Sequence, residues 1–167
     1  MNWKIAFVQT ILLVAACVSP SAFADEGKDK HACCSAADPG ALILPSDKMF
    51  GEGQVAYEAA RKIPRLCCKL FCYCGCDQIN GHTTLLECFT NENCADCQTC
   101  DEEVIQALRL SKEGKSLKET QEYIDVHFQD GYFGMFKMPS KAYLDYQKKR
   151  LWQPIPKDEP VIRLEGN

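Results

Sequence analysis

Cysteine is the feature that most constrains what this chain can fold into. Nine cysteines, together with His82, lie between residues 67 and 100, and the whole chain of 167 residues has 12. Outside reducing compartments, cysteine usually ends as a disulfide or as a metal thiolate. Cysteine at this density is therefore predicted to cross-link the chain or to bind metal, and not merely to fill space.

The N-terminus indicates export. Lys4 is the only charge before an apolar run from Ile5 to Ala16, and Ala22-Phe23-Ala24 is a small-x-small cleavage site. We therefore expect residues 1–24 to be a signal peptide and the mature chain to begin at Asp25.

The same segment has a second interpretation. Val14-Ala15-Ala16-Cys17 resembles a bacterial lipobox, in which Cys17 is lipidated and becomes the N-terminal residue. Both interpretations place the protein in the periplasm or at the cell surface, and it is a membrane-anchored lipoprotein only if Cys17 is modified.

The odd number of cysteines and the net charge limit which binding partners are expected. Removal of the signal, or lipidation of Cys17, leaves eleven cysteines, so disulfides within one chain cannot use all of them. The net charge of −4 provides no electrostatic footprint for nucleic acid. No second apolar run approaches the roughly 20 residues of a membrane span. We expect a metal ion as partner, another exported protein as a further candidate, and no nucleic acid.

Hydrophobic periodicity predicts a mostly α fold, a small single domain of short helices with a cysteine-rich loop region and a C-terminal helical hairpin. Predicted short helices cover 53–62 and 64–71, and a further helix is expected around 139–151. The expected organisation is a signal peptide (1–24), an irregular N-terminal arm (25–49), a cysteine-rich helical domain (50–131) and an aromatic, proline-containing C-terminal extension (132–167).

The hairpin is expected over about 101–129. Gly114 fits the left-handed position that ends its first helix. Ser116 and Glu119 have the spacing of a capping box at the start of the second helix, which we expect to end at Asp130-Gly131. Met135 and Met138 stand beside Phe133 and Phe136, so we interpret them as core residues in preference to thioether metal ligands.

The chemistry is concentrated between the predicted helices. Cys72-Tyr73-Cys74-Gly75-Cys76 places thiols at alternate positions, a spacing that strains a disulfide between them, and Gly75 allows a turn that gathers the sulfurs. Thiolate selects soft metals such as Cu(I) and zinc. The predicted metal ligands are Cys72, Cys74, Cys76, His82, Cys88, Cys94 and Cys97. For Cys94, Cys97 and Cys100, disulfides remain an equal alternative.

The arrangement resembles a family of exported bacterial proteins named for a Pro-Cys-Tyr-Cys-Gly-Cys motif. The resemblance rests on Phe71-Cys72-Tyr73-Cys74-Gly75-Cys76, Gly81-His82, Cys88-Phe89 and Cys94-x-x-Cys97, and it covers roughly residues 50–130. The resemblance implies a similar architecture and export from the cytoplasm. It does not imply an activity, because the family has none assigned. This chain departs from the motif at Phe71, which replaces the proline.

A weaker resemblance is to the thiol subunit of cytochrome c maturation systems. Cys-Gly-Cys followed by spaced cysteines and a helical hairpin is similar to that subunit, which presents a dithiol to apocytochrome. This resemblance implies thiol–disulfide exchange with exported partners.

The sequence favours a binding protein over an enzyme, because it contains no G-x-S-x-G elbow, H-E-x-x-H helix or glycine-rich phosphate loop. The predicted function is sequestration or delivery of Cu(I), or secondly of zinc, by the thiolate cluster. A thiol–disulfide oxidoreductase and a disulfide-stapled interaction module remain alternatives.

Overall fold

The computed structural model describes residues 32–92 and 95–150, and these residues form helices and no strands. The predicted mostly α fold class is confirmed. In chain order the elements are α1 (Ala32–Ser35), the 3-10 turns η1 (Pro39–Leu42) and η2 (Ser46–Lys48), α2 (Gly51–Lys62), α3 (Pro64–Cys67), α4 (Cys76–Ile79), α5 (Leu85–Cys88), α6 (Gln98–Lys112), α7 (Leu117–Met135) and α8 (Lys141–Lys149).

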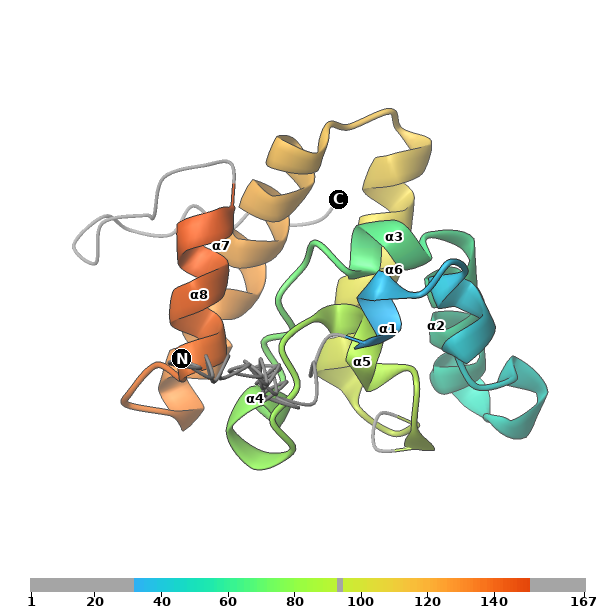
Figure 1. Cartoon of the computed structure of the whole chain (residues 1–167), viewed down its shortest axis with the longest axis horizontal. Coiled ribbons are helices and arrows are strands. Elements are labelled where there is room, and N and C mark those ends of the chain that lie inside the picture. Colours follow the sequence, from blue (N-terminus) through green and yellow to red (C-terminus); the bar gives the residue numbers. More distant parts are fainter. Residues whose placement is uncertain (1–31, 93–94, 151–167) are drawn as a thin grey trace, which may run out of the picture.

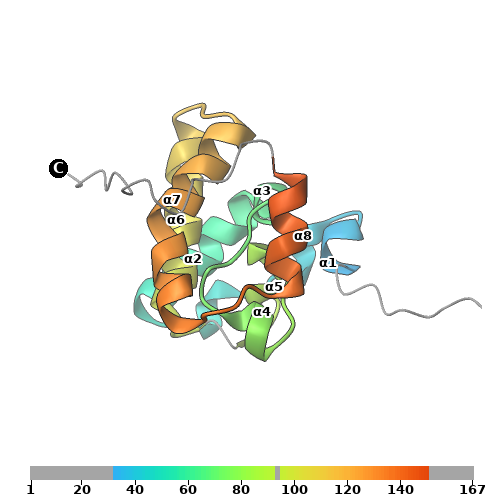
Figure 2. The same ribbon diagram turned by 90° about the vertical axis from the view of Figure 1, so that its left-hand side faces the viewer.

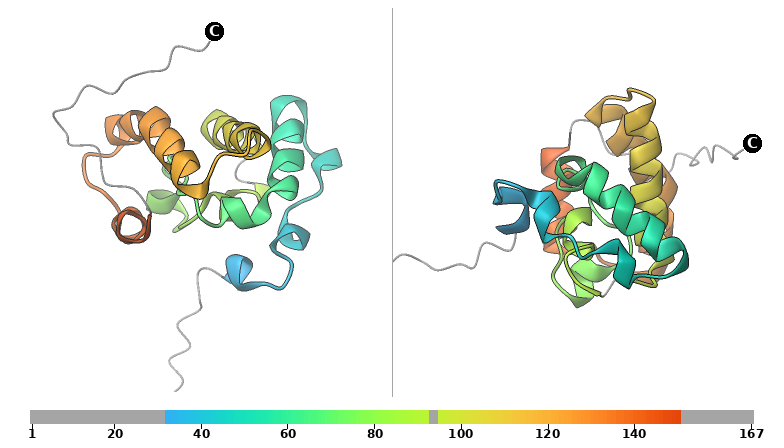
Figure 3. Two further views of the ribbon diagram at one scale, coloured as in Figure 1. Left: turned by 90° about the horizontal axis from the view of Figure 1, so that it is seen from above. Right: turned by 90° about the vertical axis from the view of Figure 1, so that its right-hand side faces the viewer.

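Three longer helices frame the molecule. α6 and α7 form the antiparallel hairpin, and α2 packs along α6 on its other side (Figures 1 and 3). The short helices α4 and α5 lie between α8 and α2 in Figure 1. Figure 2 shows the segment that joins α3 to α4 running between α7 and α8. This segment contains the Cys-Tyr-Cys-Gly-Cys run, so the long helices surround the cysteine-rich region.

The start of α7 confirms the predicted capping box. The Ser116 hydroxyl accepts a hydrogen bond from the Glu119 backbone N–H at 3.2 Å, and the Glu119 carboxylate accepts one from the Ser116 backbone N–H at 2.8 Å. The hydrogen bonds from Ser116 and Lys115 lower the pKa of Glu119 to about 2. The carboxylate is therefore ionised over the whole neutral range, and it satisfies donors that would otherwise be unpaired at the helix start.

The end of α7 differs from the prediction. Asp130-Gly131 does not stop the helix, which continues to Met135. Gly131 has a negative φ, and Tyr132, one residue later, is fully buried. The Tyr132 hydroxyl donates to Asp77 at 2.7 Å and accepts from Gln78 at 3.1 Å, both on α4. These tertiary contacts outweigh the modest cost of a glycine inside a helix.

Two predicted core residues are on the surface. Met135 and Met138 are 56% and 75% exposed, so the prediction that they pack in the core is wrong. Phe136, between them, instead packs its ring against Gly75. Along the part of the chain that the structure describes, no helix combines the length and the apolar character needed to cross a bilayer. The predicted signal peptide and Cys17 lie outside the described residues.

Candidate metal centre

The Cys-Tyr-Cys-Gly-Cys run turns sharply at Gly75. This glycine has φ +88°, in the left-handed region that disfavours side chains, and its conformation starts α4 at Cys76. The turn brings the Cys76 backbone N–H to the Cys74 sulfur, at 3.4 Å. The turn therefore holds the Cys74 sulfur at a defined position against the backbone of α4.

Four cysteine sulfurs converge beside this turn. Cys72, Cys74, Cys88 and Cys100 have Sγ atoms that all lie within 4.8 Å of one another, and we call them the four-cysteine group. Cys72 and Cys74 come from the motif, Cys88 from the end of α5 and Cys100 from the first turn of α6. Cys72, Cys88 and Cys100 are buried and Cys74 is partly buried.

The size of the group fits one metal ion. A tetrahedral site with metal–sulfur bonds of about 2.3 Å requires sulfurs about 3.8 Å apart. The Cys72 and Cys100 sulfurs are 3.4 Å apart, and the other pairs lie within the 4.8 Å limit. The four-cysteine group can therefore hold a metal ion with only small movements of the side chains.

A second set of ligand atoms adjoins the first. Cys76, His82 and Cys88 also place one ligand atom each within 4.8 Å of one another. His82 Nδ1 lies 3.3 Å from the Cys88 sulfur. The His82 backbone N–H donates to the Cys76 carbonyl at 3.3 Å, which closes the turn after α4 and returns the histidine to the cysteine that begins the helix.

The structure brings together most of the predicted ligands. Five of them belong to the two sets, namely Cys72, Cys74, Cys76, His82 and Cys88. Cys97 stands outside both sets, although its sulfur is 3.3 Å from that of Cys100. Cys94 lies outside the described residues. Cys100 is absent from the predicted ligands, and its helical spacing of three residues from Cys97 is the signal that favours its inclusion.

Electrostatics make one sulfur of the group an anion. Burial by itself raises the pKa of the Cys72 thiol, but hydrogen bonds from Cys100, Cys74 and Cys88 outweigh it and lower the pKa to about 6. For Cys88 the hydrogen bond with Cys100 acts to lower the pKa, but those with Cys72, Cys74 and Cys76 outweigh it and raise the pKa well above the ordinary value. At neutral pH the metal-free group therefore carries a thiolate at Cys72 that the neighbouring thiols solvate.

A buried carboxyl that the sequence analysis missed supports the motif. Glu103 is fully buried on α6, and its Oε1 accepts a hydrogen bond from the Tyr73 backbone N–H at 2.7 Å. Burial raises the pKa of Glu103 well above its usual range. Its position three residues after Cys100 places both side chains on the same side of α6. Glu103 therefore fixes the backbone between Cys72 and Cys74.

The ionisation of Cys72 gives a testable pH dependence for the metal-free protein. Its folded-state pKa of about 6 lies below the ordinary 9.0, so folding favours the thiolate. The resulting stabilisation is complete above about pH 9, falls as the pH drops towards 6 and is absent below it. Ultraviolet thiolate absorbance should persist down to about pH 6 in the wild type. In Cys72→Ser it should disappear at higher pH, and identical curves for the two proteins would contradict this assignment.

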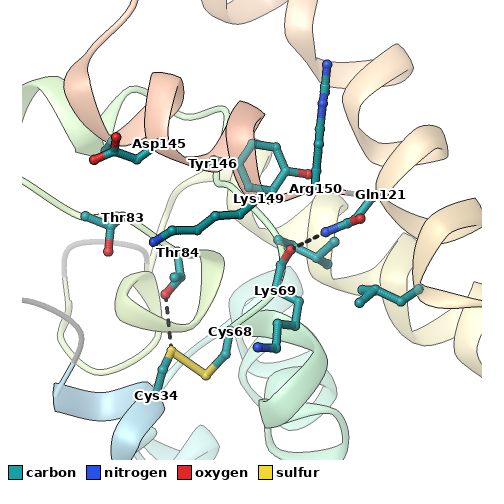
Figure 4. Close-up of a pocket in the computed structure, with 13 residues that line it drawn as sticks. Cys34, Cys68, Lys69, Thr83, Thr84, Gln121, Asp145, Tyr146, Lys149 and Arg150 are labelled. Atoms are coloured by element: carbon teal, nitrogen blue, oxygen red, sulfur yellow. Dashed lines mark hydrogen bonds between the residues drawn. A yellow bond between two sulfur atoms is a disulfide. The ribbon is translucent and has the colours of Figure 1, made fainter. Parts of the chain in front are cut away.

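Another pair of cysteines has a different fate. Cys34 and Cys68 form a disulfide that ties α1 to the end of α3, with their Cα atoms 5.6 Å apart. It borders a cavity of about 400 Å³, into which the Lys149 side chain extends from α8 (Figure 4). The Thr84 hydroxyl lies 3.7 Å from the Cys34 sulfur. Cys67, next to Cys68, is buried, and burial raises the pKa of its thiol.

Fold and site together define a class, a helical, cysteine-rich protein with converging thiols that can hold a metal ion. The family comparison is more specific. Residues 6–140 match the family described as "Protein of unknown function with PCYCGC motif", and the chain belongs to this family. No curated protein and no solved structure matches the chain. The predicted family is confirmed, and the cytochrome c maturation resemblance has no support from these comparisons.

Proposed function

We propose that this protein binds a soft metal ion, Cu(I) or zinc, outside the cytoplasm and serves to sequester or deliver it. The observation that carries the proposal is the convergence of four cysteine sulfurs within 4.8 Å of one another. Thiolate ligands favour Cu(I) and zinc over hard cations. No nucleic acid or nucleotide is part of the proposal.

Burial supports retention over catalysis. Three of the four ligand residues are at most 3% exposed, and a set of four protein sulfurs leaves no open position for substrate. Cys74 is the partly buried member, so exchange with an incoming ligand would begin there. A closed site with one accessible sulfur suits storage and transfer of the ion.

The ligands come from separate parts of the chain, so metal binding and folding are coupled. Cys72 and Cys100 are 28 residues apart and their sulfurs are already within 3.4 Å. An ion at this point cross-links the motif, α5 and α6. The expected signal peptide contains no twin-arginine pair, which favours export as an unfolded chain, so the ion would be acquired after translocation.

A second candidate function is thiol–disulfide exchange. The contact between the Cys72 and Cys100 sulfurs, together with the low pKa of Cys72, provides a thiolate beside a second thiol. Exchange also requires access by a partner disulfide. Cys72 is 3% exposed and Cys100 is fully buried, and this favours the metal function.

Elemental analysis after expression in an exported form tests the proposal. The wild type should retain Cu(I) or zinc through purification, and competition with chelators of known affinity should identify which ion it prefers. Cys74→Ser should lose most of the bound metal while its circular dichroism remains helical. Cys33→Ser is the matched control, because Cys33 is also partly buried and lies outside both ligand sets.

Wild-type protein that holds no metal under these conditions would overturn the proposal. If that protein also reduced a disulfide substrate and trapped a mixed disulfide at Cys72 or Cys100, the oxidoreductase function would replace it. Equal metal loss in Cys33→Ser and Cys74→Ser would show that the four-cysteine group is not the site.

A further inference from the structure

Cys88 occupies a special position among the ligands. Its sulfur belongs both to the four-cysteine group and to the set that it forms with Cys76 and His82. Cys88 is fully buried at the end of α5, so its position is fixed by packing. A thiolate sulfur has more than one lone pair and can bind two metal ions at once.

The two sets differ in the number and exposure of their ligands. The four-cysteine group offers four sulfurs, mostly buried. The other set offers two sulfurs and an imidazole, and both Cys76 and His82 are partly buried. A metal ion there keeps a coordination position for an outside ligand, which is the property of an open site.

His82 is oriented for this role by its neighbour. The Asn91 side-chain amide lies 3.4 Å from His82 Nε2 and also donates to the Glu87 carbonyl at 3.1 Å. Contact at Nε2 directs Nδ1 towards Cys88. Metal binding at Nδ1 leaves the ring proton on Nε2, so the Asn91 amide must turn its oxygen towards that nitrogen when the ion binds.

Cys76 is held in a similar way. The Asn80 side-chain amide lies 3.7 Å from the Cys76 sulfur, and the Asn80 backbone N–H donates to the Cys76 carbonyl at 2.8 Å. Cys76 and His82, the two candidate ligands that do not belong to the four-cysteine group, therefore each have an asparagine beside them. The short α4 turn and the loop after it position the two ligands together.

We propose that the Cys88 thiolate bridges two metal ions, a buried one in the four-cysteine group and a second, exchangeable one held by Cys76 and His82. The inference rests on the proposed metal-binding function and assigns a division of labour within it. The buried ion is retained, and the open position is where an ion is loaded from or passed to a thiol or imidazole ligand of a partner.

Anaerobic loading with an NMR-active cadmium isotope tests the bridge, since cadmium is a spectroscopic substitute for soft divalent ions. The wild type should give two cadmium resonances from this region with scalar coupling between them, because both ions share one sulfur. His82→Ala should lose one resonance and keep the other. His127→Ala is the control, because His127 is stacked on Tyr123 with a ring-centroid distance of 3.8 Å and belongs to neither set.

The outcomes separate this inference from the proposed function. One resonance in the wild type, unchanged in His82→Ala, would overturn the second site and leave the four-cysteine site intact. Two uncoupled resonances would overturn the bridge. No bound cadmium, copper or zinc would overturn the proposed function itself. Cys88→Ser provides a second measurement. If Cys88 bridges the two ions, this one substitution should weaken the binding of both of them. Loss of only one ion would contradict the bridge.

Discussion

Replacing Asp125 with alanine is expected to destabilise the fold by about 3–5 kcal/mol, because it breaks a buried ion pair by removing one of its two members. Asp125 and Arg150 form an ion pair whose side chains are both fully buried. The Asp125 carboxylate also accepts hydrogen bonds from the Tyr73 hydroxyl at 2.7 Å and the Tyr146 hydroxyl at 2.9 Å. The loss is a large part of the roughly 5–15 kcal/mol that stabilises a domain.

Thermal and denaturant unfolding of the wild type and of Asp125→Ala measure this loss of stability. Asp145→Ala is the matched control, because Asp145 makes exposed pairs with Lys141 and Lys148 on α8, and such pairs contribute only about 0–1 kcal/mol. Asp125→Asn keeps an oxygen that can accept hydrogen bonds from the tyrosine hydroxyls. Its loss of unfolding free energy should therefore lie between those of Asp145→Ala and Asp125→Ala. Similar losses for Asp125→Ala and Asp145→Ala would show that the buried network is not a major source of stability.

The second large effect is expected from Gly75→Ala. A Cβ atom at Gly75 would lie 2.3 Å from the Phe136 ring, and the left-handed conformation adds strain of roughly 1–2 kcal/mol. If the turn opens to relieve this strain, metal binding must close it again, and each 1.4 kcal/mol lowers affinity about tenfold. We therefore expect metal affinity to fall about tenfold or more, as measured by competition with a chelator.

Gly114→Ala separates backbone strain from damage to the site. Gly114 has a similar positive φ of +74° in the turn between α6 and α7, but nothing lies within 4 Å of an added Cβ. This variant should lose stability through strain and keep the metal affinity of the wild type. If both variants lowered metal affinity equally, the local role of the Gly75 turn would be wrong.

Local signals predicted the helices well. The α6–α7 hairpin follows from apolar spacing, the Gly114 turn and the Ser116–Glu119 capping box, all of which act within a few residues. The end of α7 depends on contacts between Tyr132 and α4, over 50 residues earlier in the chain. Periodicity carries no information about such contacts, so the helix was predicted too short.

The sequence predicted most of the residues of the candidate site but not which of them meet in space. C-x-C spacing predicts Cys72 and Cys74 as candidate ligands because it disfavours a disulfide between them. The pairing of Cys34 with Cys68, and the meeting of Cys72 with Cys100, depend on how the helices pack. Glu103 was missed for the same reason, since a glutamate in a helix normally faces solvent and only burial reveals its role.

The departure from the family motif has a structural counterpart. Phe71 stands where the motif has proline, and its ring centroid lies 5.4 Å from that of Tyr143 and 5.6 Å from that of Tyr146. Both tyrosines are on α8, beyond residue 140, where the family match ends. Phe71 therefore packs against a helix that lies outside the matched residues.

The disulfide and the thiol groups place opposite demands on maturation. Cys34 and Cys68 are joined by oxidation, whereas the sulfurs of Cys72 and Cys100, 3.4 Å apart, would have to stay reduced to bind an ion as we propose. An oxidant acts on whichever thiols it reaches first. Under the proposed function the order of events would determine the product. An ion that arrived before the oxidant would shield the cluster, and an ion that arrived later would meet a disulfide between Cys72 and Cys100. Metal supply would in this way act as a quality check on oxidative folding.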